Sequence, residues 1–475
     1  MVAVDVFPDV PTESMPRLEG GVLFACLPAA GLINPLIAVA EELAARGGAP
    51  IGFASTEERR ADLGRLGGEE RPLPFVSLGT FHDGWPDIFS DEQLRSMSQG
   101  GRLRTLASFL DLNIDFDYDA RQYGRMLEVL DTVKPRLLVA DLNTTWAMDA
   151  AMTRGIPFVA SMPMPASSVY LDRLPGDYPT PFSGLPRRMN VRQRGYNALF
   201  RLGFKLMLVR PGRFSATVAA MQRRKKLGLK NPTGVGSGYA DAALAILGYS
   251  TFDLEYDFPA VPEHLEMVGS MVAADVAPVP PGSELGDWLD RHESVVYLGL
   301  GTIMHLSRGQ IDAVLEVCAR LAPSGHAVLW KLSRSQQALL PPPEYLPANL
   351  RIEEWVPSQP AVLAHPHVKV FFNHGGGNAV HEALHCAKPL LVMPFWMDCY
   401  DLATRVVDRG VGLSVPNVDR PDPVEIAGKL ERILSEEAFT MRAGELGARL
   451  RAAGGAAAAA DVVESCLAGL RAGES

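Results

Sequence analysis

Short apolar runs alternate with helical stretches along both halves of this 475-residue chain. In the first half, GVLFACLP (residues 21–28), RLLVAD (136–141) and PFVAS (157–161) have β character, and helical stretches follow the first two. In the second half, SVVYLGL (294–300) and VKVFF (368–372) repeat this arrangement. Such alternation of strand and helix predicts parallel, doubly wound sheets. We therefore expect an α/β protein with two doubly wound domains that face one another across a cleft.

Changes in composition predict where these domains begin and end. Residues 1–19 are acidic and contain Pro, which indicates a flexible leader and no signal peptide. A first domain over residues 20–255 is followed by a Pro- and Gly-rich linker over 256–285. The second domain covers 286–450, and the Ala-rich residues 451–475 predict a helical tail.

Charge and cysteine content exclude several classes of protein. A net charge of -10 argues against a general nucleic-acid binder, because nothing overall neutralises phosphates. The five cysteines lack metal-type spacing, which fits a reducing cytoplasm better than a disulfide scaffold. No run approaches the ~20 apolar residues that a membrane span needs. We expect a soluble, cytoplasmic protein, whose oligomeric state the sequence leaves open.

One segment departs from this acidic composition. Residues 187–230 hold 13 Lys or Arg and no Asp or Glu, with apolar residues interleaved. Two interpretations fit this pattern. The segment is either a pair of surface helices with solvated basic faces, or a patch that contacts an anionic membrane surface or an acidic partner.

Residues 355–403 carry the strongest functional signal. A strand ends at His374 and breaks into three glycines, and a helix begins near Asn378. A glycine turn that enters a helix presents free backbone N–H groups and the positive end of the helix dipole, so it suits a diphosphate. Glu382, about one turn into the helix, could accept hydrogen bonds from ribose hydroxyls. Trp355 could stack on a base.

This segment resembles the donor-binding signature of the glycosyltransferases that use UDP- or dTDP-sugars, including those of macrolide and other natural-product pathways. The signature is roughly W-x-P-Q, H-P, H-G-G-x-N-S-x-x-E, G-x-P and P-x-x-x-D-Q-x-x-N-A. This sequence supplies Trp355, Pro357, His365, Pro366, His374, Gly375, Gly376, Asn378, Glu382, Pro389, Pro394, Asp398 and Ala403. Three further elements match: GLINPLIAVAEELAARG, LLVADLNTTWAMDAA and Gly301-Thr302.

The resemblance implies the GT-B architecture, in which one Rossmann-like domain binds a small-molecule acceptor and the second binds the nucleotide sugar. It implies no metal and no cofactor beyond that co-substrate. Trp355 would stack on uracil or thymine, Glu382 would hold the ribose, and Asp398 would contact the sugar. The diphosphate would be bound by His374, Gly376, Gly377, Asn378 and Thr302, and the same donor site would include Gly301, Val356, Ala379 and Cys399.

The pattern breaks at the position of the catalytic base. The family places a histidine two residues before the Asn-Pro of the first loop, and here that residue is Leu32. The acidic partner of the missing histidine is retained as Asp141. On the donor side, Cys399 replaces a Gln, Ala379 replaces a Ser, and Ser358 stands where Gln follows Trp-x-Pro.

Three interpretations follow from these departures. The chain is an active transferase that either needs no base or uses Asp141 directly, with a pKa raised by desolvation. Alternatively, it is a pseudoenzyme that keeps the nucleotide site as a binding or partner subunit. In the third interpretation, it performs non-glycosyl chemistry on nucleotide-linked substrates.

Other histidines and the acceptor loops complete the candidate site. His82 and His305 are weaker candidates for a substitute base, and His381 and His385 have helical spacing but no evident third ligand, so we predict no metal site. An apolar acceptor is expected from residues of three loops in the first domain: Phe81, Trp85, Phe89, Phe109, Phe116, Met162, Met164 and Tyr170.

Overall fold

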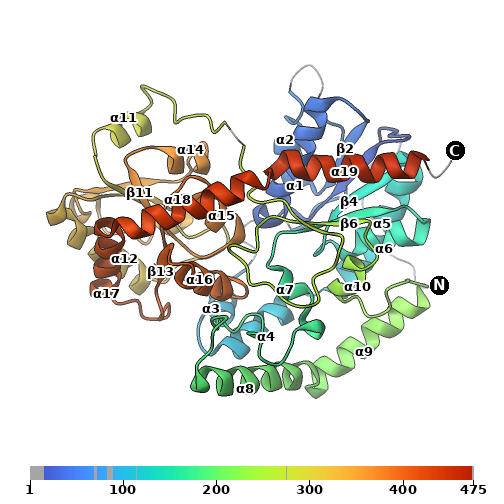
Figure 1. Ribbon diagram of the computed structural model, residues 1–475, viewed down its shortest axis with the longest axis horizontal. Helices are drawn as coiled ribbons and strands as arrows, with labels where there is room; N and C mark the ends of the chain where they lie inside the picture. Colours follow the sequence, from blue (N-terminus) through green and yellow to red (C-terminus); the bar gives the residue numbers. More distant parts are fainter. Residues whose placement is uncertain (1–14, 69–71, 83–88, 114, 274, 473–475) are drawn as a thin grey trace.

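The computed structural model describes residues 15–68, 72–82, 89–113, 115–273 and 275–472. Two α/β domains lie side by side, and a pair of C-terminal helices crosses from the second domain to the first (Figure 1). Each domain contains one parallel sheet with helices on both faces. The predicted α/β class with two doubly wound domains is therefore confirmed.

The first sheet has seven strands in the order β3-β2-β1-β4-β5-β6-β7. All its neighbouring strands pair in parallel. Its strands are β1 (Val22–Ala25), β2 (Ile51–Ser55), β3 (Phe75–Ser77), β4 (Leu137–Asp141), β5 (Phe158–Met162), β6 (Ala245–Gly248) and β7 (Leu265–Met267).

The second sheet has six parallel strands in the order β10-β9-β8-β11-β12-β13. They are β8 (Val295–Gly299), β9 (Ala327–Lys331), β10 (Leu350–Glu353), β11 (Val368–Asn373), β12 (Leu390–Val392) and β13 (Gly412–Ser414). In both sheets the strand order reverses at one place, between β1 and β4 and between β8 and β11. Open α/β sheets bind ligands outside the carboxyl ends of the strands at such a reversal.

Helices connect the strands. Those of the first domain are α1 (Ala30–Arg46), α2 (Arg60–Leu63), α3 (Asp91–Ser98), α4 (Arg102–Asn113), α5 (Phe116–Val133), α6 (Thr145–Arg154), α7 (Ala166–Val169), α8 (Val191–Leu208), α9 (Pro211–Lys226) and α10 (Gly236–Ala240). Those that follow are α11 (Glu284–Asp290), α12 (Arg308–Leu321), α13 (Arg334–Gln337), α14 (Gln359–Ala364), α15 (Gly377–His385), α16 (Cys399–Asp408), α17 (Pro423–Ser435), α18 (Glu437–Ala452) and α19 (Gly455–Ala472).

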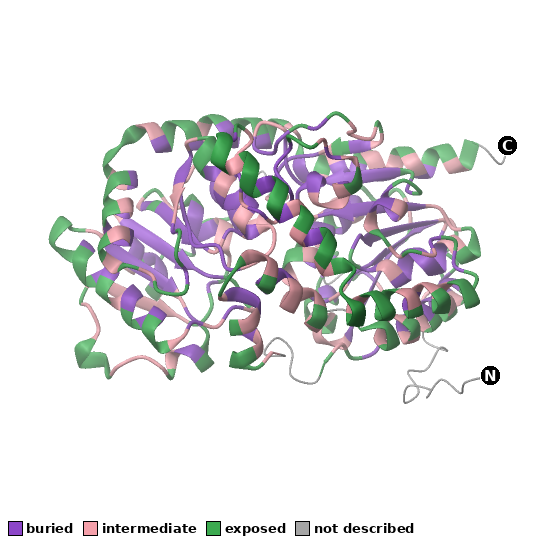
Figure 2. Ribbon diagram, turned by 90° about the horizontal axis from the view of Figure 1, so that it is seen from below, coloured by how far each residue is buried: buried purple, intermediate pink, exposed green. Residues whose placement is uncertain are grey.

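Each sheet separates two apolar cores, because successive side chains of a strand point to opposite faces. In β1, Leu23 and Ala25 pack into one cluster, whereas Val22 and Phe24 pack into the other. Figure 2 shows these buried strands in purple, enclosed by helices with green outer faces. The near-continuous apolar strands of the sequence are the consequence of burial on both faces.

Two predicted boundaries differ from the structure. The strand β7 lies inside the segment assigned to the linker, because Leu265–Met267 completes the first sheet. The leader is packed at its described end: Leu18 is buried, and its N–H donates to Val133 O at 2.8 Å. The tail is helical, and α19 packs against α1 of the first domain rather than extending the second.

One helical stretch, Glu437–Ala472, is long and apolar enough to cross a membrane by length and composition alone. The sequence expectation that no stretch approaches this composition is corrected in that respect. The stretch spans α18 and α19. Arg46 on α1 contacts Asp461 and Glu464 on α19, at 2.6 and 2.8 Å. The stretch is therefore part of the contact between the domains.

Candidate functional site

His374 lies between two glycines where β8 and β11 end. A Cβ built on Gly376 would be 2.5 Å from Nε2 of His374, and one built on Gly301 would be 3.1 Å from its Cε1. Gly301 also has a φ of 89°, which favours glycine. Larger residues at either position would displace the imidazole ring. The turn therefore needs glycine for close approach and not only for backbone freedom.

The imidazole of His374 is partly buried and neutral. Burial, and secondly the charge of Lys331, lowers its pKa to about 4. Its Nδ1 atom is buried with no hydrogen-bond partner among the described residues. A buried polar nitrogen without a partner is unusual in a folded protein. A phosphate oxygen is the kind of acceptor that such a nitrogen could bind when it carries the proton.

The N-terminus of α15 lies directly beside His374. Gly376 is the N-cap residue and provides no side-chain cap, so the first N–H groups of the helix are not satisfied by a side chain from that position. Gly377 is the first helical residue, so the predicted triple-glycine turn is one residue shorter than expected. The side chain of Asn378 bonds to the first domain, because its Nδ2 donates a hydrogen bond to Ala30 O at 3.2 Å.

A second group of side chains lies at the ends of β9 and β10. Trp355 is 66% exposed, and Lys331 Nζ lies 4.7 Å from the centre of its ring. Glu382 Oε2 accepts a hydrogen bond from Gln359 Nε2 at 2.6 Å, and Tyr297 donates to Gln359 Oε1 at 3.1 Å. Burial raises the pKa of Glu382 to about 7. The carboxyl group of Glu382 is thus held in place, and one face of the Trp355 indole ring is exposed to solvent.

The loop after Trp355 explains one of the departures from the family signature. Ser358 caps α14, because its Oγ accepts from Ala361 N at 3.2 Å. Gln359 is then the residue that reaches Glu382. The amide expected at position 358 is therefore supplied one residue later. Neither Lys331 nor Gln359 was assigned to the site from the sequence, although Lys331 is the last residue of a strand and lies at the same sheet edge.

Three residues assigned to the donor site have buried side chains instead. Val356 and Ala379 belong to an apolar core of the second domain. Cys399, the first residue of α16, is 2% exposed, and its Cβ would lie 3.4 Å from a Cβ on Gly375. Their side chains point into the protein, so only their backbone groups remain candidates for contact with a ligand. Thr302, by contrast, is exposed in the loop after β8.

An aromatic contact between the domains lies beside Asp398, at the sugar end of the proposed donor site. Asp398 is the residue before α16, and burial raises its pKa to about 6. Two residues before it, Trp396 lies 6.4 Å, centroid to centroid, from Phe109 on α4 of the first domain. This aromatic pair brings the two domains together beside Asp398.

Asp141 ends β4, at the reversal of strand order in the first sheet. Its Oδ1 accepts hydrogen bonds from Asn143, from the backbone N–H at 2.8 Å and the side-chain amide at 3.0 Å. Its Oδ2 is buried with no hydrogen-bond partner among the described residues. Burial, which outweighs the two Asn143 hydrogen bonds, raises the pKa of Asp141 to about 7. Leu32 is in the first turn of α1, which follows the neighbouring strand β1, and it is partly buried.

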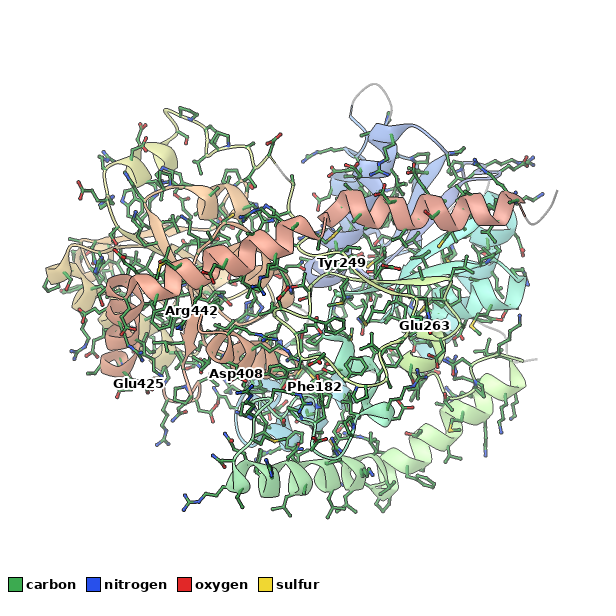
Figure 3. All side chains as sticks on the ribbon, in the orientation of Figure 1. Phe182, Tyr249, Glu263, Asp408, Glu425 and Arg442 are labelled. Carbon is green, nitrogen blue, oxygen red and sulfur yellow. The ribbon has the colours of Figure 1, made fainter. Side chains whose placement is uncertain are left out.

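A small pocket joins these two halves of the site. It is lined by Asn34, Pro35, Pro163, Tyr249, Met271, Val272, Asn378, His381 and Glu382. Figure 3 labels Tyr249 at the place where the domains meet. Its hydroxyl donates to Ser161 Oγ at 2.8 Å, and the negative charge of Asp141 contributes to the upward shift of its pKa after burial. The pocket thus connects the Asp141 side with Glu382. A second hollow, between α1 and α19, lies at the opposite, amino end of β1.

Two histidines on α15 have structural partners. His381 contacts Gly377 O at 2.6 Å through Nδ1 and Ser250 Oγ at 2.8 Å through Nε2. His385 Nδ1 contacts Ser270 Oγ at 2.6 Å. Both rings therefore connect α15 to the segment that leaves the first domain. Within the described part of the chain, no group of three or more His, Cys, Asp or Glu is placed to hold a metal ion.

Only some of the residues predicted to line the acceptor site are free to contact an acceptor. Met162 and Tyr170 are buried in the core of the first domain, so their side chains are not free to line a binding site. Phe81 packs edge-on against Tyr118, at 5.5 Å between ring centroids. Trp85 falls outside the described residues. The candidate base His305 lies 3.7 Å from Asp91 and is oriented toward α3.

The domain contact near α16 is polar and buried. Asp401 accepts hydrogen bonds from Phe182 N at 2.7 Å and from Gly184 N at 2.8 Å. Figure 3 labels Phe182 and Asp408 close to this boundary. The contact fixes a loop of the first domain against the helix that begins beside Asp398. It therefore sets the spacing between the donor and acceptor halves of the site.

Comparison with solved structures supports the fold. The glycotransferase of kitacinnamycin superposes with a TM-score of 0.69 at 20% identity, covering 95% of this chain and 100% of that one. Os79 from O. sativa, in complex with U2F and trichothecene, superposes with a TM-score of 0.67 at 18% identity, covering 94% and 100%. These glycosyltransferases establish that the two facing domains form a GT-B arrangement.

Sequence comparison identifies the family. UDP-glucuronosyltransferase 2A3 of Cavia porcellus is 24% identical over 328 residues, which are 68% of this chain and 58% of that protein. UDP-glycosyltransferase 84A3 of Arabidopsis thaliana is 35% identical over 139 residues, 28% of each chain. The chain therefore spans less than two thirds of the length of these curated relatives. The family model described as "UDP-glucoronosyl and UDP-glucosyl transferase" matches residues 128–446, more than half of the chain. With the glycine-lined His374 and the Trp355–Glu382 group inside the matched region, the chain belongs to the family of UDP-glucuronosyl and UDP-glucosyl transferases.

Proposed function

We propose that this protein transfers a sugar from a UDP- or dTDP-sugar to a small, largely apolar acceptor. The observation that carries the proposal is the buried, unpartnered His374 nitrogen, enclosed by Gly301 and Gly376 beside the N-terminus of α15. A diphosphate bound there would receive helix N–H groups and an imidazole. Its negative charge would be balanced by these fixed dipoles, so the site needs no metal.

The remaining donor contacts follow from the same edge of the second sheet. Trp355 has the exposed face that a pyrimidine base would stack on, and Lys331 holds the other side of the indole. Glu382, fixed by Gln359, is placed to accept hydrogen bonds from ribose hydroxyls. Asp398 would contact the sugar.

We propose Asp141 as the general base in place of the histidine. Burial holds its pKa near neutrality, so a useful fraction is deprotonated at pH 7 while the group still accepts a proton. The acceptor oxygen would attack the anomeric carbon as the bond from that carbon to the diphosphate breaks. The proton would pass from the acceptor to Asp141, and the nucleoside diphosphate would leave with its charge at α15. A single displacement of this kind inverts the anomeric centre.

The acceptor side of the pocket favours an apolar molecule. Pro163, Met271 and Val272 line it, and Phe109 faces Trp396 at the nearby domain contact. Solved structures with this fold include the glycotransferase of kitacinnamycin, the calicheamicin glycosyltransferase and the spinosyn rhamnosyltransferase. These products are consistent with a role in natural-product tailoring.

Calorimetric titration of the purified protein with UDP, dTDP and their sugar conjugates tests the donor site. We expect one diphosphate to bind more tightly than the other, and its sugar conjugate to release free diphosphate when an acceptor is added. Binding without release for any hydroxyl, amine or carboxylate acceptor would favour a binding subunit. No binding of either diphosphate would reject the proposal.

A further inference from the structure

The helix α8 presents an apolar stripe to solvent. Leu199, Leu202 and Leu206 are between 53% and 68% exposed, and their spacing of three and four residues puts them on one face. The opposite face of α8 is the one that packs on the domain, through residues such as Phe200 and Phe204. The outer face of a surface helix is normally polar. The stripe is therefore not explained by packing within the described chain.

The exposed apolar residues gather on this part of the molecule. Among the described residues, nine of the 17 large hydrophobic side chains that are exposed lie between 191 and 227, which is a small fraction of the sequence. The stripe continues past the end of α8 to Val209 and then to Phe214 on α9. Single exposed hydrophobic residues are ordinary, but a continuous group marks an interaction surface.

Cations border the stripe. At 100° per residue, Arg192 lies on one side of the leucines and Lys205 on the other, and Arg210 follows at the junction with α9. Among the described residues, none of these three side chains has a hydrogen bond or ion pair. Other basic residues of the segment are neutralised: Arg213 contacts Asp111 at 2.5 Å, and Arg224 contacts the buried Asp149 at 2.7 Å. The bordering cations are thus available for an external partner.

The position of the surface suits a broad and flat partner. Figure 1 shows α8 and α9 end to end along one edge of the molecule, and Figure 2, seen from that side, shows exposed residues along both. The helix rests on α4, where a Cβ built on Gly203 would be 2.5 Å from Leu103. The stripe is consequently raised at the edge and not enclosed in a groove.

The positive charge of this segment indicates which kind of partner it binds. Residues 187–230 hold 13 of the 45 basic residues and none of the 55 acidic ones, in a protein with a net charge of -10. A second copy of this chain docked face to face would bring these cations against one another. A surface with anionic headgroups above an apolar layer would satisfy both the cations and the leucines.

We propose that α8 and α9 bind this protein peripherally to an anionic lipid surface. Leu199, Leu202 and Leu206 enter the boundary between headgroups and acyl chains, and Arg192, Lys205 and Arg210 contact the headgroups. The long axes of both helices then lie in the plane of the membrane. The interaction is reversible, because it combines a short apolar stripe with only a few charges.

Flotation of the full-length protein with vesicles tests this proposal. We expect the protein to float with vesicles of phosphatidylcholine containing phosphatidylglycerol and to float much less with phosphatidylcholine alone. Added salt should weaken the binding, because it screens the headgroup charges. Replacing Arg192, Lys205 and Arg210 by Gln should lower the partition coefficient by about fivefold for each cation removed.

The apolar stripe is tested by the variant Leu199→Ser, Leu202→Ser, Leu206→Ser, which we expect to lose at least tenfold in binding. The matched control replaces Val424 and Met441 by Ser, since these are 58% and 60% exposed on the second domain, and it should bind as the unmodified protein does. A matched control for charge is Arg65→Gln, Arg95→Gln, Arg420→Gln. Equal thermal unfolding of all variants shows that folding is preserved.

Four results would overturn the proposal. Absence of flotation with anionic vesicles excludes a lipid surface. Binding that the serine variant retains shows that α8 is not the contact. If a concentration-dependent dimer forms without vesicle binding, and the serine variant abolishes it, the surface belongs to a second copy of the chain. If an acidic protein competes at low salt without vesicle binding, the surface belongs to a protein partner.

Discussion

The carboxyl group of Asp141 is bound on one side only: both hydrogen bonds from Asn143 reach Oδ1, at 2.8 and 3.0 Å, while Oδ2 is buried with no partner among the described residues. This asymmetry leaves one oxygen available to accept a proton. Leu32 lies in the first turn of α1, which follows the strand next to β4, so it is at the same strand reversal as Asp141. We propose that Asp141 accepts the proton of the acceptor through this free oxygen.

The raised pKa of Asp141 predicts a pH-dependent effect on stability. Because the folded pKa is about 7 and the ordinary value is 3.8, the folded state holds a proton that the unfolded state releases. The carboxyl group of Asp141 therefore contributes most to the stability of the fold below pH 4, and this contribution is lost as the pH rises through 7. Asp141→Asn cannot ionise, so we expect its Tm to increase relative to the unmodified protein between pH 4 and 8. Calorimetric scans across that range measure the difference, at about 2–4 °C per kcal/mol for domains of this size.

A Tm difference that stays constant with pH would mean that Asp141 ionises alike in the folded and unfolded states. The exposed carboxylate of Glu293 offers a control, since Glu293→Gln should leave the pH profile unchanged.

Restoring the missing histidine should raise activity toward hydroxyl acceptors. In Leu32→His, a base would sit in the first turn of α1, at the same strand reversal as Asp141. A positioned base typically contributes about 10²–10⁴-fold, so we expect an increase of about tenfold or more in kcat at pH 8. Initial rates of diphosphate release measure the effect.

The gain in kcat should require the carboxyl group of Asp141. In the double variant Leu32→His, Asp141→Asn, the histidine lacks the group that orients it, and the increase should disappear. A gain that persists in the double variant would show that the two residues do not act together.

Trp355 should affect nucleotide binding and leave stability unchanged. Its side chain is 66% exposed, so Trp355→Ala removes little buried surface. Base stacking on an aromatic ring contributes about 1–3 kcal/mol, which corresponds to a loss in affinity of about 5- to 150-fold. Titration calorimetry with the preferred diphosphate gives the Kd, and Tyr345→Ala, at 73% exposed, is the matched aromatic control. Equal Kd values in the two variants would exclude stacking on Trp355.

The glycine enclosure of His374 predicts a steric effect. In Gly376→Ala, the new methyl group would lie 2.5 Å from the imidazole, so the ring must move from its place between the glycines. We expect diphosphate affinity to fall by at least tenfold. Gly309→Ala is the control, because no atom lies within 4 Å of its added Cβ. An unchanged Kd in Gly376→Ala would separate His374 from diphosphate binding.

The sequence predicts the parts of the fold that depend on local patterning. Strands buried on both faces are nearly continuous apolar runs, so the runs at 136–141, 157–161 and 368–372 match β4, β5 and β11 within two residues. The short strand β7 was missed, because its three residues sit in a Pro- and Gly-rich segment and gain stability from pairing with β6. The return of α19 to the first domain is likewise a tertiary contact, and helix propensity contains no information about it.

In the candidate site, too, local features can be predicted from the sequence and tertiary contacts cannot. Gly301, His374, Gly376 and Glu382 could be assigned because the turn chemistry and the spacing in the chain define them. Cys399 could not be placed, since its burial depends on Gly375 packing against it across a turn. The orientation of Gln359 depends on the cap that Ser358 makes one residue earlier. Such contacts arise only when the elements are packed together.

The rate of sugar transfer to a hydroxyl acceptor, compared between the unmodified protein and Asp141→Asn in single turnovers at pH 8, tests the central claim most directly. The account predicts one glycoside formed for each nucleoside diphosphate released, and a rate about 10²–10⁴-fold lower in the variant. Equal rates in the two proteins would contradict the assignment of Asp141 as the base, and no glycoside from either would contradict the proposed transferase.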